Sequence, residues 1–144
     1  PEALTVTPGG DLYIADTGNH RVRRVDRATG VITTVIGDGT PAASGAGAPA
    51  LFFTVDTPRG VAVDVHGNLF ITSRYALRMV TAGADGTATG QDEVLTLYGV
   101  TPRDDFPESV TQCLTAVLLA QDNGSLWMTD ACQGFLMRLT RESL

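Results

Sequence analysis

The sequence contains no lysine, so all ten of its basic residues are arginines. It has only two histidines and two cysteines, and aromatic residues make up 6% of the chain. No apolar run approaches the ~20 residues of a transmembrane helix, and there is no G-x-S-x-G, P-loop or G-x-G-x-x-G sequence. These absences argue against a membrane span and leave covalent catalysis and phosphate binding without a recognisable motif.

The net charge of −6 disfavours nucleic-acid binding, because an acidic surface repels phosphate. Four arginines lie between Arg21 and Arg27, but neighbouring residues of a strand point to opposite faces, and Asp26 interrupts the run. The two histidines, His20 and His66, are not spaced as a metal-binding pair, and zinc needs three or four converging ligands. We therefore predict no nucleic-acid partner and no zinc site.

A repeat of 57 residues organises the chain. Its three copies are GGDLYIAD (9–16), HGNLFITS (66–73) and NGSLWMTD (123–130), and their central leucines are Leu12, Leu69 and Leu126. Each copy reads as a glycine-containing turn followed by a strand. The repeat implies three structural units of one kind.

Further runs recur around these segments. They are ALTVTP, GVAVDV and AVLLAQ upstream, RRVD, LRMV and MRLT downstream, and VITTVIG (31–37) and VLTLYGV (94–100) after the first two copies. Each unit then reads as a four-stranded antiparallel meander with a buried first strand and an outer strand of alternating polarity. Such units, recurring every ~40–60 residues, indicate β-propeller blades. We predict an all-β chain with two complete blades and a three-stranded third blade.

The repeat resembles the NHL repeat, whose pattern is PxGVAVDxxGNLxIxDxxNxRVRxVD. The matching runs are LTVTPGGDLYIADTGNHRVRRVD, PRGVAVDVHGNLFITSRYALRMV and TAVLLAQDNGSLWMTDACQGFLMRL. The second copy reads as three residues shorter at its hairpin, and the third lacks the Asn-His pair. The resemblance implies a propeller that typically has six blades. The arginine-only, threonine-rich composition is similar to that of NHL-repeat proteins of bacterial envelopes and secretions, which implies an extracellular or cell-envelope location.

The repeat also predicts the boundaries of the units. We place blade 1 at about 1–38, blade 2 at about 58–100 and blade 3 at about 113–144, with inserts at about 39–57 and 101–112. A blade buries its faces against its neighbours, so each outer blade of a half ring should expose an apolar face. We expect the remaining blades to come from the same longer chain, or from a second copy that closes the ring.

Five polar residues recur from copy to copy and are expected to build the blades. Arg24, Arg78 and Arg138 each precede an aliphatic residue, and we expect Arg24 and Arg138 to bond to an acid or a carbonyl where blades meet. Asp16 and Asp130 are the candidate partners. The segment DTGN that begins at Asp16 predicts a turn with positive φ, in which this aspartate accepts backbone N–H bonds.

Residues without a counterpart in the other copies are the candidates for binding. In blade 1 they are His20, Arg21, Arg23 and Arg27. In the second insert they belong to TPRDDFPES and are Arg103, Asp104, Asp105 and Phe106. Loops carry function more often than the scaffold that presents them, so this insert is the first choice for a contact loop.

The cysteines, Cys113 and Cys132, both fall in connections at the same end of blade 3. A disulfide between them is therefore geometrically plausible if their Cα atoms lie within ~7 Å. It would close a loop of roughly 20 residues and stabilise the chain by about 3 kcal/mol. A disulfide would also imply an oxidising compartment, whereas two buried thiols are the alternative.

Two classes of function follow. We predict a non-catalytic binding scaffold that presents loops to a protein, peptide or glycan partner, without a cofactor. The alternative is part of a propeller enzyme of the lactonase or lyase type. Propeller lactonases of the gluconolactonase type hold calcium on acidic and asparagine residues of the innermost strands, where Asp64 is the one clear acid here.

Overall fold

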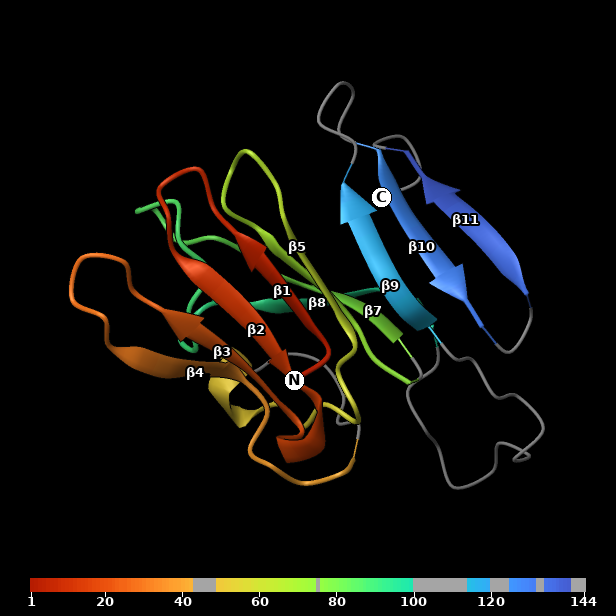
Figure 1. Cartoon of the computed structure of the whole chain (residues 1–144), viewed down its shortest axis with the longest axis horizontal. Helices are drawn as coiled ribbons and strands as arrows, with labels where there is room; N and C mark the ends of the chain where they lie inside the picture. Colours follow the sequence, from red (N-terminus) through yellow and green to blue (C-terminus); the bar gives the residue numbers. More distant parts are fainter. Residues whose placement is uncertain (43–48, 75, 100–113, 120–124, 132–133, 141–144) are drawn as a thin grey trace.

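The computed structural model describes residues 1–42, 49–74, 76–99, 114–119, 125–131 and 134–140. It contains three antiparallel sheets with strand orders β1-β2-β3-β4, β5-β6-β7-β8 and β9-β10-β11 (Figure 1). The strands are β1 Ala3–Val6, β2 Leu12–Asp16, β3 Arg21–Val25, β4 Ile32–Ile36, β5 Gly60–Val63, β6 Leu69–Thr72, β7 Ala76–Val80, β8 Val94–Gly99, β9 Leu114–Leu119, β10 Leu126–Asp130 and β11 Phe135–Leu139. Two 3-10 helices, η1 Thr17–Asn19 and η2 Ala50–Phe52, are described besides them. The prediction of an all-β chain with blades of four, four and three strands is confirmed.

The first strands of the sheets lie together, as the inner strands of a propeller do. β5 contacts β1 on one side and β9 on the other (Figure 1). The first hairpin of blades 1 and 2 turns at a glycine with positive φ, Gly10 at +94° and Gly67 at +87°. Glycine adopts this conformation without the steric cost that a Cβ would bring. The GGD and HGN segments therefore form the hairpins that begin these blades.

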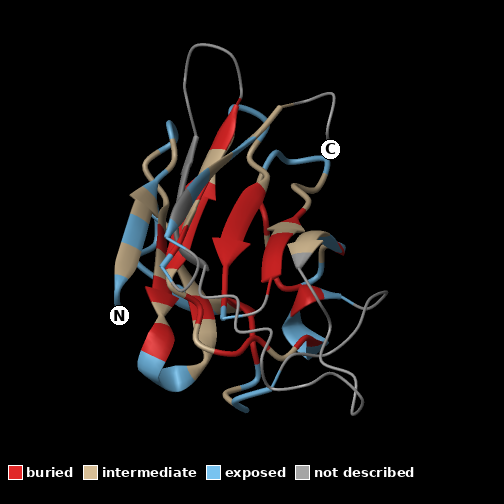
Figure 2. Cartoon of the chain, turned by 90° about the vertical axis from the view of Figure 1, so that its right-hand side faces the viewer, coloured by how far each residue is buried: buried red, intermediate tan, exposed pale blue. Residues whose placement is uncertain are grey.

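Two hydrophobic cores lie between adjacent blades. The first core, between blades 1 and 2, includes Tyr13, Ala15, Val22, Leu69, Ile71 and Val80. The second core, between blades 2 and 3, includes Ala62, Phe70, Leu77, Leu126 and Met128. Because successive residues of a strand point to opposite faces, the neighbours Phe70 and Ile71 belong to different cores. Blade 2 is thus covered on both faces, and Figure 2 shows buried residues concentrated in the middle of the molecule.

The connection between β4 and β5 adds side chains to the first core. Phe53 and Val55 of this connection are buried, and η2 packs on β4. The cover makes both Val35 and Ile36 buried, although they are consecutive residues of β4. The predicted alternation of exposed and buried residues is therefore wrong for the end of this strand, whose first half is exposed.

Blade 1 has an outer face that no described residue covers. Leu4, Val6 and Ile32 on this face are 64%, 58% and 50% exposed. Leu12 and Ile14 on the same face are half-buried. Figure 2 shows the exposure along the strand that carries the N-terminus. In blade 2 the residues at the positions of Leu12, Ile14 and Val25 are Leu69, Ile71 and Val80, all of them buried in the first core.

The three arginines that the sequence aligned do not share one position, so the prediction is wrong for Arg78. Arg24 and Arg138 lie opposite the aromatic residue of the second strand of their blades. Arg78 instead lies opposite Ile71, just as Arg23 lies opposite Ile14. Arg23 therefore has a counterpart in blade 2, contrary to the prediction that it has none.

The length of the second hairpin explains this error. Leu12 pairs with Val25 in blade 1, whereas Leu69 pairs with Val80 in blade 2. The hairpin of blade 2 is thus shorter by two residues rather than three. The sequence alignment assumed three residues, so it is off by one in the third strand. A shift of one residue along a strand moves a side chain to the other face of the sheet.

The shift places Arg78 on the face of blade 2 that carries Ile71, where its guanidinium is buried. This side chain is 1% exposed, and burial lowers the pKa of its guanidinium. Its Nη1 donates to the Ser73 Oγ at 3.5 Å, which is a long hydrogen bond. Arg78 is therefore bonded to a hydroxyl beside the β6–β7 hairpin, in partial agreement with a blade-building role.

Candidate functional site

A cleft opens between blades 1 and 2 at the end where the first hairpin of each blade lies. It has a volume of about 720 Å³, and we call it the interblade cleft. Its lining includes Asp11, Tyr13, Arg24, Asp26, Arg27, Asp64, Asp85 and Thr87. These residues come from the β1–β2, β3–β4, β5–β6 and β7–β8 connections and the adjoining strands. Four aspartates and two arginines line the cleft, so its charge is acidic overall.

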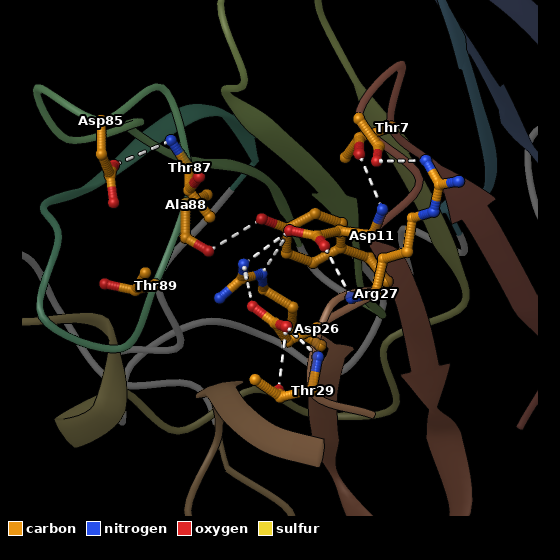
Figure 3. Close-up of polar contacts among 12 residues, drawn as sticks. Thr7, Asp11, Asp26, Arg27, Thr29, Asp85, Thr87, Ala88 and Thr89 are labelled. Atoms are coloured by element: carbon orange, nitrogen blue, oxygen red, sulfur yellow. Dashed lines mark hydrogen bonds and ion pairs between the residues drawn. The ribbon is translucent and has the colours of Figure 1, made fainter. Parts of the chain in front are cut away.

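An arginine between two aspartates forms the wall on the side of blade 1. Arg24 donates from Nε to the Asp11 Oδ2 at 2.9 Å and from Nη2 to both aspartates, at 3.2 Å for Asp26. Asp11 also accepts the backbone N–H of Arg27 at 2.9 Å, and Asp26 accepts that of Thr29 at 2.8 Å. Figure 3 shows Asp11 and Asp26 joined in this network. The carboxylates are therefore fixed before any ligand arrives.

These bonds set the protonation states of Asp11, Asp26 and Arg24. The backbone N–H of Arg27 is the main cause that holds the pKa of Asp11 below its usual value, and the Arg24 guanidinium adds to it. For Asp26 the main cause of a lowered pKa is the backbone N–H of Thr29. Burial is the largest single influence on Arg24 and works against its charge, but the bond to Asp11 and the nearby negative charges together outweigh burial and raise the pKa of Arg24. All three groups stay charged at neutral pH.

Tyr13 joins the two blades at the base of the interblade cleft. Its side chain is 1% exposed, and its hydroxyl donates to the Ala88 carbonyl at 2.9 Å. Figure 3 shows Ala88 on the β7–β8 connection of blade 2. Burial raises the pKa of Tyr13 to about 12. The phenol is therefore a neutral hydrogen-bond donor and a structural link between the blades.

The opposite wall is built by two aspartates of blade 2. Asp64 accepts the backbone N–H groups of His66 and Asn68 at 2.9 and 2.8 Å, so it shapes the β5–β6 turn. Asp85 accepts the backbone N–H of Thr87 at 3.0 Å and is exposed. No group of three or more histidines, cysteines, aspartates or glutamates among the described residues is arranged to hold a metal. The cleft offers negative charge and hydrogen-bond acceptors to a ligand.

The structure separates the four binding candidates of blade 1. His20 and Arg21 lie at the end opposite the interblade cleft, Arg23 lies on the outer face, and only Arg27 lines the cleft. Arg27 donates to the Gly9 carbonyl at 3.3 Å. The candidates of the second insert, Arg103, Asp104, Asp105 and Phe106, lie outside the described residues. The same holds for Cys113 and Cys132 and therefore for the proposed disulfide.

His20 holds the β4–β5 connection against the β2–β3 turn. Its Nδ1 accepts the backbone N–H of Thr57 at 3.2 Å and lies 3.4 Å from the Asp56 carboxylate. His20 is also the residue of the turn with positive φ, at 51°. The prediction that the DTGN segment itself supplies the positive φ is therefore wrong. Asp16 accepts the Asn19 side-chain amide at 2.9 and 3.0 Å, and no described residue donates a backbone N–H to its carboxylate.

Arg24 bonds to an acid, as predicted, but the particular partners predicted for Arg24 and Arg138 are wrong. Arg24 bonds to Asp11 and Asp26 instead of Asp16, and Arg138 donates to the Ser125 Oγ at 2.8 and 3.1 Å instead of to Asp130. Asp16 and Asp130 lie at the far end of the hairpin, three strand positions away, which is ~10 Å. Asp11 and Ser125 each precede the second strand and lie within reach.

Sequence reasoning missed most of the interblade cleft. Asp11, Asp26 and Tyr13 belong to segments that were assigned to turns and strands, and Asp85 lies in a long β7–β8 connection that was not singled out. A usable signal for Asp11 was its position directly before the repeated leucine, since Ser125 has that position in blade 3. No sequence pattern pairs Tyr13 with Ala88, because 75 residues separate them.

Comparison with known proteins agrees with this architecture. A family model of the NHL repeat matches residues 1–25. This match covers β1, β2, η1 and β3, which carry Asp11, Tyr13 and Arg24. A search of curated proteins gives no significant match.

Solved structures similar to this chain are propeller-type proteins. A catalytically inactive virginiamycin B lyase from Staphylococcus aureus, solved with quinupristin, has a TM-score of 0.63 at 13% identity over 99% of this chain and 39% of its own. A Bacteroides thetaiotaomicron protein of unknown function has a TM-score of 0.67 at 20% identity over 90% and 32%. A streptogramin B lyase has a TM-score of 0.57 at 17% identity over 95% and 39%. The chain thus spans less than two fifths of the length of these proteins, and the likeness shows the fold. In the part of the chain that the structure describes, no helix has the length and hydropathy to cross a membrane.

The wall of the interblade cleft gives a prediction for acid conditions. Asp11 has a lowered pKa in the fold, so its contribution to stability is present above its unfolded pKa of ~3.9 and is lost as the pH falls below that value. We expect Asp11→Asn to cost about 1–2 kcal/mol at pH 7, because bonds to a charged group are lost, and less at pH 3. Urea unfolding of both chains from pH 7 to pH 2.5 measures this. If the difference in free energy of unfolding between the two chains stayed constant over this range, the lowered pKa of Asp11 would be contradicted.

Proposed function

We propose that the chain is part of a binding scaffold whose interblade cleft takes a basic segment of a protein or peptide. The observation that carries the proposal is the preorganised acidic wall, in which Asp11 and Asp26 are fixed by Arg24 and by backbone N–H groups. Groups that are already ordered lose little entropy when a ligand binds. The net charge of −6 also favours the approach of a cationic partner.

Asp85 offers a test that leaves the fold intact. Its carboxylate is exposed and accepts one N–H, from Thr87, which an asparagine oxygen can also accept. Asp38 is a matched control at the opposite end of the molecule, because its Oδ1 accepts the N–H of Thr40 at 2.7 Å in the same way. Asp85→Asn and Asp38→Asn therefore remove one charge each from similar turns.

The probes are the peptides acetyl-Gly-Arg-Arg-Gly-amide and acetyl-Gly-Glu-Glu-Gly-amide, titrated into the 144-residue chain while amide NMR signals are followed. We expect saturable shifts at Thr87 and Thr29 with the arginine peptide alone. Asp85→Asn should weaken binding roughly two- to fivefold, which corresponds to one exposed charge pair, and Asp38→Asn should leave it unchanged. Equal shifts with both peptides, or equal effects of both variants, would contradict the proposal.

An enzyme is the second candidate, because two of the similar solved structures are a virginiamycin B lyase and a streptogramin B lyase. At 13% and 17% identity this likeness shows a shared fold and does not transfer an activity. A calcium titration separates the candidates. If added calcium shifted the amide NMR signal of Asp64 in a saturable way, and a chelator reversed the shift, the enzyme would be favoured. Asp64 is the acid that follows inner strand β5.

A further inference from the structure

Two arginines of blade 1 lie in a second recess, on the face away from blade 2. Its volume is about 390 Å³, and it is lined by Asp16, Gly18, Asn19, Arg21, Arg23 and Gly39. We call it the arginine recess. Arg21 and Arg23 are two positions apart on β3, so their side chains share one face of the strand. The arginine recess lies at the opposite end of the blade from the interblade cleft.

The nearby carboxylates are occupied elsewhere. Asp16 lies opposite Arg21 in the sheet, but both of its oxygens accept the Asn19 amide. The Asp38 carboxylate accepts the backbone N–H of Thr40 at 2.7 Å. No described acidic residue lies within ion-pair distance of Arg21 or Arg23. Arg21 and Arg23 thus form no ion pair with the described residues, and the Asp38 carboxylate interacts with the Arg21 charge only at longer range.

Both guanidinium groups present a donor that has no acceptor. Among the described residues, the Nε atoms of Arg21 and Arg23 are buried and have no hydrogen-bond partner. A buried donor without a partner costs about 1–3 kcal/mol. The Nε atoms of Arg59 and Arg78 also have no partner, but Arg21 and Arg23 differ from them in lining one recess together, where an acceptor can enter.

Arg21 is held in place for such a contact. Its Nη2 donates to the Asp38 carbonyl at 2.8 Å. A Cβ at Gly39 would come within 2.7 Å of the same Nη2, so this glycine, with φ of +96°, allows the guanidinium to lie against the backbone. The planar guanidinium fork suits the two oxygens of a carboxylate or phosphate.

We propose that Arg21 and Arg23 form an oxyanion-binding site for a carboxylate or phosphate group. The site is separate from the interblade cleft and does not depend on the function proposed for that cleft. Its ligand has the opposite charge to the basic segment expected there. The anion can be a side-chain carboxylate of a polypeptide or a free ion, and the two sources are distinguished by experiment.

The test follows the arginine Nε–Hε signals of the 144-residue chain by NMR at constant ionic strength. The probes are acetate, inorganic phosphate, acetyl-Leu-Asp-Val-amide and its neutral counterpart acetyl-Leu-Asn-Val-amide. We expect saturable shifts of the Arg21 and Arg23 signals with the charged probes. Tighter binding of the aspartate peptide than of acetate would identify a polypeptide carboxylate, and equal binding of all three anions would identify a site for free ions.

Variants assign the site to these side chains. Arg21→Gln and Arg23→Gln should each weaken anion binding about tenfold, the effect of losing one hydrogen bond to a charged group. Arg59→Gln is the matched control, because Arg59 lines neither the arginine recess nor the interblade cleft, so its replacement should leave binding unchanged. Arg23→Lys keeps the charge but lacks the fork, and it should bind less tightly than the wild type.

Two results would overturn the proposal. One is a linear, non-saturating shift of the Nε–Hε signals with every anion in the wild-type chain. The other is an unchanged affinity in the folded double variant Arg21→Gln/Arg23→Gln. The wild-type titration decides the matter even if the double variant does not fold.

Discussion

Ile71→Ala is expected to lower the free energy of unfolding by about 3 kcal/mol, and Ile14→Ala by about 1 kcal/mol or less. The two isoleucines occupy the same position in blades 2 and 1, opposite Arg78 and Arg23. Ile71 is 1% exposed in the first core, whereas Ile14 is half-buried on the uncovered outer face. The difference in cost therefore measures what a neighbouring blade contributes at one position.

Urea unfolding followed by far-UV circular dichroism measures both costs. The comparison is internally controlled, because the residue type, the strand and the position in the repeat are the same. An equal loss in both variants would show that the outer face of blade 1 is covered in solution. The cost of Ile14→Ala should then grow with protein concentration if a second copy is the cover.

The chain is expected to lose about 2–3 kcal/mol of its free energy of unfolding between pH 10 and pH 12, because the buried phenol of Tyr13 ionises later in the fold than in the unfolded chain. In the unfolded chain a tyrosine ionises near pH 10, whereas burial raises the pKa of Tyr13 to about 12 in the fold. A raised pKa gives a contribution that is complete below pH 10 and disappears as the pH rises through 12. The unfolded state gains by releasing the proton first.

Tyr13→Phe isolates this effect. The variant should be about 1 kcal/mol less stable than the wild type at pH 8, because the bond to the Ala88 carbonyl is lost. Above pH 11 the order should reverse, since phenylalanine does not ionise, while Tyr98 is common to both chains. Urea unfolding at pH 8 to 12 measures the crossing. A constant difference between the two chains over this range would exclude Tyr13 as the alkaline group.

The fold was predictable because its signals are local. Gly10 and Gly67 mark hairpins, and alternating apolar residues mark the strands between them. The 57-residue spacing of Leu12, Leu69 and Leu126 then shows that the three units are alike. Neither inference needs knowledge of contacts between units.

The candidate sites were harder to predict because they depend on register and on distant contacts. The residue type of Arg78 matched Arg24, but a hairpin two residues shorter placed it opposite Ile71 and on the other face. Arg21 and Arg23 were singled out as unique to blade 1, and the structure keeps them together while it moves Arg27 to the opposite end. The sequence also does not show that the Asp38 carboxylate accepts from Thr40 while the Asp38 backbone carbonyl accepts from Arg21.

The double cover of blade 2 has a consequence for how the chain opens. In a linear stack of repeats, stability is a sum of terms within units and terms between neighbours. Blade 2 takes part in both interfaces, through Ile71 on one side and Phe70 on the other. Opening of blade 1 or blade 3 breaks one interface, but opening of blade 2 breaks both at once. Thermal fluctuations therefore begin at the ends of the stack, and the middle blade is the last part of the chain to release its amide protons to solvent.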